Sequence, residues 1–453
     1  MFFREKELRI LEDFQNNDLH KACAIYGRRR VGKTELILAY IREHDPESCY
    51  YYQCTGYDYA TCLSDFKSVL RRDFSDDTIF DSLASFRDVF SYLSKVRNKS
   101  YFIVIDEFPF LCRKNDDAAV EFQWIIDHAL GSSKLVLLGS NLSFMKSQIN
   151  DTEAPLYGRF DDMIEVMPFT FQEIKELFPV FEDAVDVYAV TGGIAQYVMM
   201  FREYNSVREA VLSLFFDKNG RLFQETRNLL MQELRDVTTY ISVLRALGSG
   251  EKDSGQIAAK AGIDARGVFA YLNKLIDMGI VSIVGNPLSA KKHDKRYRIS
   301  DSLFRFSFTF IEPNVSMISA IGQESARFIL DDRYHEFLGA AYEDIIRSSC
   351  YGYAAAGILP FMPVTVGKWW GNVRSNDEWR ETEVDLIAYD AHNIVIGECK
   401  YKNKMIGLKE LEELKAKVPF IATGGRKAYI LLASRAGFTD AVRKQDAILI
   451  EKA

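Results

Sequence analysis

The chain has 453 residues and a formal net charge of −7, with 57 Lys and Arg against 64 Asp and Glu. Domains of roughly 100 to 200 residues are the norm, so a chain of this length is expected to form several units. Hydrophobic residues make up 48% of the sequence, which excludes a disordered chain and predicts well-packed cores. The acidic balance excludes a general attraction to nucleic acid, so any such binding needs a local basic surface.

The start of the chain, its hydropathy and its cysteines bear on the cellular compartment. Four charged residues at 4–7 argue against a secretory signal peptide, and no apolar run approaches the roughly 18 residues of a membrane span. The cysteines are odd in number and lack the paired short spacings of a zinc site, which is typical of reduced thiols. We therefore expect a cytoplasmic protein that makes no membrane contact.

Residues 1–170 alternate short apolar strands with amphipathic helices, a pattern typical of a mostly parallel sheet with helices on its faces. From 171 to 230 the strand signal ends and helical spacing takes over, which predicts a helical lid. The expected fold class is α/β, beginning with a P-loop NTPase sheet domain. The expected strands of that domain are 22–26, 48–53, 101–106 and 134–139.

A complete G-x-x-x-x-G-K-[ST] motif lies between the first expected strand and a helix expected at 35–42. In this setting backbone amides surround the phosphates of a nucleotide, Lys33 reaches the β and γ phosphates, and the Thr34 hydroxyl binds Mg²⁺. The sequence therefore predicts an ATP site that uses Mg²⁺. Its predicted nucleotide-binding residues are Gly27, Arg28, Arg29, Arg30, Val31, Gly32, Lys33, Thr34 and Glu35.

The buried strand expected at 101–106 ends in two carboxylates, Asp106 and Glu107. In this arrangement Asp106 holds Mg²⁺ through water and Glu107 polarises the attacking water, which predicts ATP hydrolysis as well as binding. The alternative is that Glu107 is a solvated residue at the tip of the strand.

Two further polar positions are candidates for roles in hydrolysis. Asn141, preceded by Ser140, follows the strand at 134–139, where a polar side chain would sense the γ-phosphate. Arg159 would neutralise transition-state charge, either in cis or from a neighbouring subunit of a homo-oligomer. An ordinary capping or surface role is an equally open interpretation of both residues.

Several motifs of the first 200 residues together resemble the archaeal-type ATPase family, a branch of the AAA+ superfamily. The resemblance implies that the Gly192-Gly193 turn belongs to the lid behind the nucleotide, whereas by itself this dipeptide indicates a break between helices. The motifs are residues 3–8, 26–34, 106–108, 139–141 and 191–193.

Residues 231–313 have the order of elements typical of a winged helix-turn-helix: a helix, a short helix at 255–260, a turn at Gly262, a helix at 266–278 and a closing hairpin. Residues 291–298 of that hairpin carry five cations against one anion. This excess predicts contact with DNA phosphates, although a rigid packing module with a soluble hairpin is the alternative. The candidate DNA-contacting residues are Arg266, Lys291, Lys292, Lys295 and Arg296.

A last α/β domain is expected at 323–453, with Asp385 on one strand and both Glu398 and Lys400 on the next. Glu398 and Lys400 are two residues apart and share one face of their strand. This is the geometry in which carboxylates hold a hard divalent cation while an ammonium orients water. Glu343, on a helix upstream, is a candidate to complete the site.

The pattern resembles the PD-(D/E)xK phosphodiesterase fold of many nucleases, and the segment is similar to the uncharacterised C-terminal domain that often follows archaeal-type ATPase domains. The resemblance implies that Asp385 and Glu398 bind Mg²⁺, that the Cys399 carbonyl completes the coordination and that Lys400 serves the nucleophilic water. Degenerate members of this fold bind nucleic acid or act as scaffolds. The motifs outside the site are residues 301–306 and 368–371.

Two aromatic clusters are predicted to serve packing. Trp369 and Trp370 are expected to anchor a core or a domain interface, with stacking on bases as the functional alternative. Tyr50, Tyr51 and Tyr52 are expected in a strand that packs on both faces.

As a whole, the sequence predicts an ATP-binding and ATP-hydrolysing protein that acts on DNA, with Mg²⁺-dependent nuclease activity in its last domain. The alternative function is a nucleotide-driven regulatory switch, whose inactive nuclease-like domain binds DNA or a protein partner.

Overall fold

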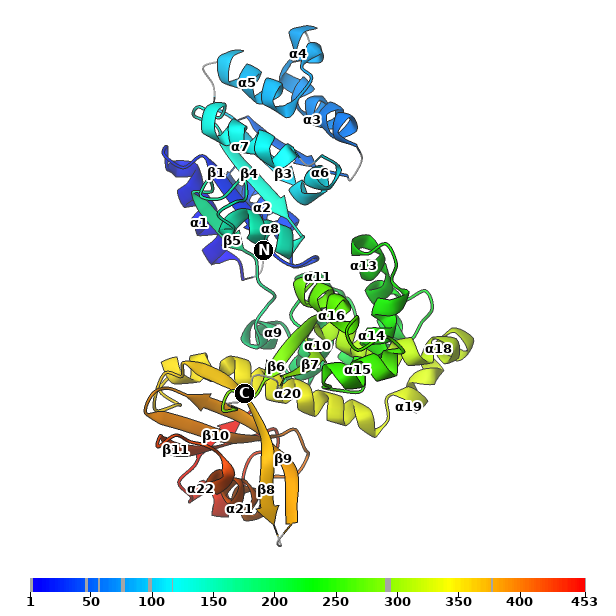
Figure 1. The fold of residues 1–453 in the computed structure, drawn as a ribbon, viewed down its shortest axis with the longest axis vertical. Coiled ribbons are helices and arrows are strands. Elements are labelled where there is room, and N and C mark those ends of the chain that lie inside the picture. Colours follow the sequence, from blue (N-terminus) through cyan, green and yellow to red (C-terminus); the bar gives the residue numbers. More distant parts are fainter. Residues whose placement is uncertain are drawn as a thin grey trace. The chain divides into compact units, whose positions relative to one another are not determined.

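The computed structural model describes residues 3–44, 48–55, 58–74, 78–96, 100–115, 117–289, 295–375 and 378–452. The chain divides into two compact units, whose elements are labelled in Figure 1. The N-terminal unit comprises Met1–Phe169 and Ile194–Tyr197. The C-terminal unit comprises Thr170–Gly193 and Val198–Ala453.

The N-terminal unit is built on a five-stranded sheet in the order β2-β3-β4-β1-β5, and every pair of neighbours is parallel. The first four strands lie where the sequence predicts them, and β5 was not predicted. The strands are β1 (Ala22–Tyr26), β2 (Cys49–Gln53), β3 (Phe102–Asp106), β4 (Lys134–Gly139) and β5 (Asp162–Glu165).

Helices cover both faces of this sheet, because successive side chains of a strand point to opposite sides and both sides are apolar. Ile103 and Ile105 of β3 enter a core built with α3, α5 and α7. Phe102 and Val104 of the same strand enter a second core, built with α1 and α2. The helices are α1 (Glu5–Asn16), α2 (Lys33–His44), α3 (Tyr59–Phe74), α4 (Thr78–Ser82), α5 (Phe86–Val96), α6 (Phe108–Lys114), α7 (Ala118–His128) and α8 (Leu142–Asn150).

The strand order decides which residues meet at the carboxyl edge of the sheet. Since β4 lies between β1 and β3, three segments are neighbours at one edge: the loop after β1, the residues after β4, and the carboxylates Asp106 and Glu107 at the end of β3. In open parallel sheets this edge is where ligands bind.

The region predicted as a lid, 171–230, contains helices and no strand among its described residues. It belongs to the C-terminal unit except for Ile194–Tyr197, which belong to the N-terminal unit. Gly192 ends the second of these helices with a left-handed backbone, φ 59°, which a glycine adopts without steric cost. The helices are α9 (Phe171–Leu177), α10 (Phe181–Thr191), α11 (Ala195–Phe201), α12 (Val207–Phe215) and α13 (Glu225–Glu233).

Three helices and a two-stranded antiparallel hairpin follow, in the order expected of a winged helix-turn-helix, although that assignment stays a prediction. Asp253 and Gln256 form a capping box at the start of the second helix, and Gly262 ends it with φ 69°. The elements are α14 (Thr238–Leu247), α15 (Ser254–Ala261), α16 (Val268–Asp277), β6 (Val281–Gly285) and β7 (Lys295–Ile299). We call β6 and β7 the hairpin.

A run of helical segments leads to the last domain. Its longest member, α20, spans 24 residues and begins at a side-chain cap, where Asp331 accepts from the Arg333 amide. The segments are α17 (Ser302–Phe306), a π-helical turn at Ser307–Ile311, 3₁₀ turns at Glu312–Asn314 and Gly322–Ser325, α18 (Val315–Ile321), α19 (Ala326–Ile329) and α20 (Asp332–Ala355).

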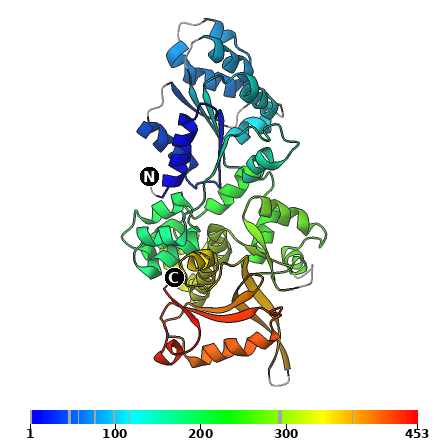
Figure 2. The same ribbon diagram turned by 90° about the vertical axis from the view of Figure 1, so that its left-hand side faces the viewer.

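The chain ends in a mixed five-stranded sheet of order β12-β11-β10-β9-β8, in which β8, β9 and β10 are antiparallel and β10, β11 and β12 parallel. Helices α20 and α21 lie on opposite sides of this sheet (Figure 2). The elements are β8 (Thr365–Ser375), β9 (Glu378–Tyr389), β10 (Asn393–Lys400), α21 (Leu408–Lys417), a 3₁₀ turn at Val418–Phe420, β11 (Lys427–Ser434), α22 (Asp440–Arg443) and β12 (Ile448–Glu451). Among the described residues, no helix combines the length and the apolar content needed to cross a membrane.

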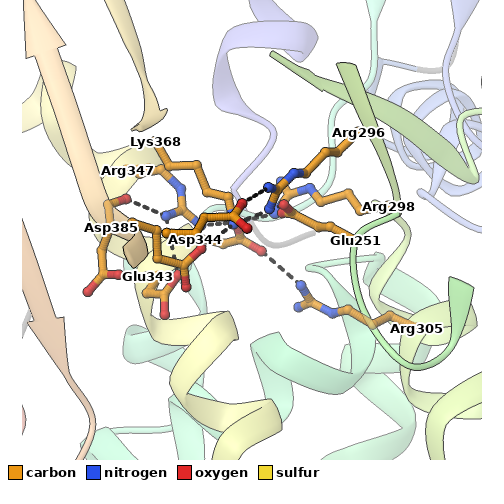
Figure 3. A network of polar contacts seen from close by, with 11 residues as sticks. Glu251, Arg296, Arg298, Arg305, Glu343, Asp344, Arg347, Lys368 and Asp385 are labelled. Carbon is orange, nitrogen blue, oxygen red and sulfur yellow. Dashed lines mark hydrogen bonds and ion pairs between the residues drawn. The ribbon is translucent and has the colours of Figure 1, made fainter. Parts of the chain in front are cut away.

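Asp344 of α20 is the acidic centre of a polar network in the C-terminal unit (Figure 3). Its carboxylate accepts hydrogen bonds from Arg298 of β7 at 2.7 Å, from Arg305 of α17 at 2.8 Å and from Arg347 of α20 at 2.7 Å. Burial alone would raise the pKa of Asp344, yet the three guanidinium groups hold that pKa well below its ordinary value. The network therefore ties the hairpin and α17 to α20.

We expect Asp344→Asn to lower the free energy of unfolding of the C-terminal unit by on the order of 3 kcal/mol, because three cations would lose their shared anion. Since the pKa of Asp344 is lowered in the folded protein, this stabilisation is complete above the ordinary carboxyl pKa of about 3.9 and is lost in stronger acid. Urea unfolding of the full chain at neutral pH measures it. Glu203→Gln, which removes an exposed ion pair with Arg221, is the control, and equal effects of the two substitutions would contradict the prediction.

Candidate functional site

The loop between β1 and α2, residues 27–32, is shaped by two glycines for different reasons. A Cβ at Gly27 would lie 2.5 Å from the Val166 carbonyl oxygen, so this position is fixed by a close approach of backbone. Gly32 has φ 100°, a conformation that L side chains rarely adopt. Val31 is fully buried between them and anchors the loop, and its carbonyl accepts a hydrogen bond from Arg4 at 3.2 Å.

Lys33 lies at the start of α2 with its ammonium turned back into the loop, and the residue is 5% exposed. Its Nζ donates to the Gly27 carbonyl at 3.0 Å and to the Arg28 carbonyl at 2.9 Å. Burial lowers the pKa of Lys33 to about 8, although Glu107 and Asp106 oppose that effect. A buried ammonium whose hydrogen bonds go to loop carbonyls fits the phosphate groups of a nucleotide.

Asp106 ends β3 and is fully buried, with hydrogen bonds to both carboxylate oxygens. Its Oδ2 accepts from the Thr34 hydroxyl at 2.6 Å and from the Tyr51 phenol at 2.8 Å. Its Oδ1 accepts from the Glu107 amide at 2.8 Å. Thr34 and Asp106, which the sequence predicts as Mg²⁺ ligands, are therefore in direct contact, and their oxygens are of the type that Mg²⁺ prefers.

Glu107 has a left-handed backbone, φ 54°, at the start of α6. This conformation is uncommon for residues other than glycine and is often found at functional sites. The Glu107 carboxylate is half-buried, and its Oε1 accepts from the Ser140 hydroxyl at 2.5 Å. Glu107 is thus held at the site, and the side chain that contacts it from the end of β4 is Ser140.

Asn141 and Arg159 make the capping and surface contacts that the sequence analysis gave as the alternative to catalytic roles. Asn141 caps α8, where its Oδ1 accepts from the Phe144 amide at 3.0 Å. Arg159 donates from Nε to both carboxylate oxygens of Asp127 at 3.1 Å. Catalytic roles for Asn141 and Arg159 stay predictions.

Arg30 connects the loop to the segment Ile194–Tyr197 of the same unit. Its Nη1 donates to the Gln196 side chain at 3.1 Å, and its carbonyl accepts from the Gln196 amide at 3.1 Å. The guanidinium also lies 5.7 Å from the centre of the Tyr197 ring. The neighbouring Arg29 lies over the Phe110 ring, and Glu35 forms an exposed ion pair with Arg42.

Tyr51 is a site residue that the sequence did not reveal. Tyr50 and Tyr52 are buried in a hydrophobic core, as predicted for a packed strand. Tyr51 points to the other side of the sheet and donates to Asp106. Alternation along the strand predicts that Tyr51 faces the opposite side of the sheet from Tyr50 and Tyr52. Its contact with Asp106 could not be predicted, because that requires knowing that β2 pairs with β3.

The carboxylates predicted near the C-terminus are brought together by strand pairing. Gly397 pairs with Leu386 in antiparallel register, which places Asp385 beside Glu398. Asp385 Oδ2 accepts from the Cys399 amide at 2.8 Å, and Lys400 Nζ donates to Glu398 Oε1 at 2.5 Å. We call Glu343, Asp385, Glu398 and Lys400 the carboxylate cluster.

Two cations that the sequence did not single out also bind the carboxylate cluster. Lys417 of α21 donates to Glu398 Oε2 at 3.2 Å. Arg347 donates to Glu343 Oε2 at 3.4 Å and to the Asp385 carbonyl at 2.5 Å, as Figure 3 shows. Neither contact has a signal in the sequence, because α20 and α21 reach the strands through the tertiary fold.

Crowding of negative charge marks the carboxylate cluster. Burial and then Asp385 raise the pKa of Glu343 to about 8, and burial and then Glu398 raise the pKa of Asp385 to about 6. Among the described residues, however, no group of three or more His, Cys, Asp or Glu side chains is arranged so that it could hold a metal ion. A metal site here would therefore rest on Asp385, Glu398 and backbone oxygen, donors whose chemistry fits Mg²⁺.

The predicted DNA-contacting residues have different surroundings. Lys291 and Lys292 lie outside the described residues, and Arg266 and Lys295 are exposed. Arg296 donates to Glu381 of β9 at 2.6 Å, and its guanidinium lies 4.7 Å from the centre of the Trp370 ring. Arg296 is thus engaged within the C-terminal unit. Trp369 and Trp370 are both buried, as predicted for packing residues.

The parallel sheet, its glycine loop and the Thr34–Asp106 pair define a P-loop ATPase unit. Comparison with known proteins agrees. Residues 1–201 match the family described as an ATPase domain predominantly from Archaea. Residues 307–416 match a family of archaeal and bacterial proteins of unknown function.

Two individual proteins are similar to most of the chain. An uncharacterized protein of Methanocaldococcus jannaschii is 29% identical over an aligned length of 415 residues, and the match covers 88% of this chain and 87% of that protein. The solved structure of a Walker-type ATPase of Pyrococcus abyssi is 21% identical, with a TM-score of 0.51, and the match covers 68% of this chain and 96% of that one. The structural likeness shows a shared fold. Together with the family match, it confirms the enzyme class predicted from the sequence, an ATPase.

We expect Lys33→Ala to weaken ATP binding by at least about 100-fold, because the buried ammonium predicted to bind the phosphates is lost. Isothermal titration calorimetry with a non-hydrolysable ATP analogue and Mg²⁺ measures the change. Arg42→Ala, at the exposed end of the same helix, is the matched control and should bind as the unaltered protein does. Equal affinity of the Lys33→Ala and control variants would contradict this assignment.

Proposed function

We propose that this protein binds and hydrolyses ATP at the loop described above and acts on DNA, with the carboxylate cluster as a Mg²⁺-dependent phosphodiester-cleaving site. The observation that carries the second part is the convergence of Glu343, Asp385, Glu398 and Lys400, which come from a helix and two strands. Crowded carboxylates with raised pKa values next to an ammonium are typical of a functional site.

In the ATP site, each residue of the proposal has one task. Lys33 binds the β and γ phosphates, and the amides of residues 27–32 surround them. Thr34 and Asp106 would hold Mg²⁺, which neutralises charge on the transferred phosphoryl group. Glu107, which accepts a hydrogen bond from Ser140 at 2.5 Å, would accept a proton from the attacking water.

In the carboxylate cluster, Asp385, Glu398 and the Cys399 carbonyl would hold Mg²⁺, which polarises the scissile phosphate. Lys400, which donates to Glu398, would orient the attacking water. Arg347 donates to the backbone carbonyl of Asp385 and to the Glu343 carboxylate, so it links helix α20 to strand β9. The proposed DNA contacts outside the cluster are the exposed Arg266 and Lys295.

We expect Asp385→Asn to reduce Mg²⁺-dependent cleavage of DNA by at least about 100-fold, since an amide is a poor substitute for a carboxylate at Mg²⁺. Purified protein is incubated with labelled single-stranded and double-stranded DNA, with and without ATP. Glu413→Gln, which changes an exposed carboxylate of α21, is the matched control. If the unaltered protein leaves every DNA intact with each divalent metal and nucleotide, the cleavage proposal is wrong.

A second function, a nucleotide-driven switch, is favoured by the ion pairs that occupy the hairpin. Arg296 pairs with Glu381 at 2.6 Å and Arg298 with Asp344 at 2.7 Å, so these arginines are held by the chain itself. The carbonyl of Trp370 also accepts from the Asn286 side chain at 2.7 Å. In this function ATP releases these contacts, and the hairpin then becomes available to DNA or a protein partner.

For the switch, we expect ATP with Mg²⁺ to increase amide hydrogen exchange in β6 and β7, because release of the ion pairs exposes the hairpin. Exchange in β11, a central strand of the mixed sheet, serves as the internal control. Lys33→Ala should remove the effect of ATP on the hairpin. Identical exchange of the hairpin with and without nucleotide would exclude this function, whatever the result of the DNA assay.

A further inference from the structure

We infer that Tyr51 is a positioning residue for ATP hydrolysis, whose phenol fixes the carboxylate of Asp106 for Mg²⁺. The inference rests on the ATP site proposed above and adds a residue that lies on a different strand, outside the glycine loop and the Asp106-Glu107 pair. Tyr51 belongs to β2, which borders β3, and it pairs in register with Val104. Its hydroxyl reaches Asp106 Oδ2 at 2.8 Å.

Among the described residues, three donors contact the buried Asp106 carboxylate, and they come from different parts of the fold. The Thr34 hydroxyl donates to Oδ2 at 2.6 Å, and its oxygen lone pairs would remain available to Mg²⁺. The Glu107 amide donates to Oδ1 and belongs to the same backbone as Asp106. Tyr51 donates to Oδ2 from a different strand and is not itself a proposed Mg²⁺ ligand. A buried acceptor needs such a partner, because an unsatisfied one is costly.

The chemistry of a phenol suits this task. A neutral donor orients a carboxylate without cancelling its charge, whereas a Lys or Arg at the same place would compete with Mg²⁺ for Asp106. A phenol, whose ordinary pKa is about 10, carries its proton at neutral pH and can therefore donate to Asp106.

The position of Tyr51 also gives the contact rigidity. Tyr51 belongs to β2, which pairs with β3 along its whole length, so the Tyr51 hydroxyl and the Asp106 carboxylate are held by the same sheet. Partners of metal ligands that lie one layer outward orient the ligands, and their removal typically lowers metal affinity or activity by about 10 to 100-fold. We expect a change of this size from the loss of the Tyr51 hydroxyl.

The test compares Tyr51→Phe with Tyr52→Phe in the full chain. Both substitutions remove one phenolic oxygen from the same strand, but Tyr52 packs in the core against Phe66. The rate of ATP hydrolysis is measured against Mg²⁺ concentration at saturating ATP, and ADP affinity is measured in the presence of a chelator. We expect Tyr51→Phe to raise the Mg²⁺ concentration for half-maximal rate by about 10-fold, with unchanged metal-free ADP affinity.

Two results would overturn the inference. One is a Mg²⁺ response of Tyr51→Phe that equals that of Tyr52→Phe and the unaltered protein. The other is a parallel loss of metal-free ADP binding, which would make Tyr51 a residue of general structure. Failure of the ATP site itself would show separately, as undiminished nucleotide affinity of the Lys33→Ala variant.

Discussion

The hydrogen bond between the Thr34 hydroxyl and the Asp106 carboxylate is the contact on which the N-terminal unit is organised. Neighbouring strands lie about 4.8 Å apart, so the ends of β1 and β3, with β4 between them, are separated by about 10 Å. The loop after β1 has to bend back over β4 to close that gap, and the backbone of Gly32 makes the bend possible. Lys33 follows the same loop, whereas Ser140 and Glu107 meet because β3 and β4 are neighbours.

The C-terminal unit is organised by charge, in contrast to the neutral donors around Asp106. Arg347 donates to Asp344, to Glu343 and to the carbonyl of Asp385, so one guanidinium serves both the arginine network and the carboxylate cluster. The hairpin enters the same network through Arg298. A displacement of the hairpin would therefore change the contacts of Arg347, and through Arg347 it would shift the carboxylate cluster.

Local sequence patterns were enough to predict those parts of the sites whose residues lie close together along the chain. The strand ending in Asp106, the glycine loop before Lys33 and the pairing of Asp385 with Glu398 all follow from residues close along the chain. Tyr51, Arg347 and Lys417 did not emerge, because their partners are chosen by strand order and helix docking. The engagement of Arg296 by Glu381 was missed for the same reason, since a hairpin sequence does not reveal what packs against it.

The left-handed backbone of Glu107 has a consequence for the way this protein can diverge. Glycine and asparagine tolerate that conformation better than glutamate does, so replacing Glu107 by either of them would relax the backbone and also remove the carboxylate proposed as the base. Selection for stability and selection for turnover thus oppose each other at this position. In a lineage that no longer needs ATP hydrolysis, substitutions of Glu107 would stabilise the backbone and would be retained. Its members would still bind ATP but would no longer hydrolyse it.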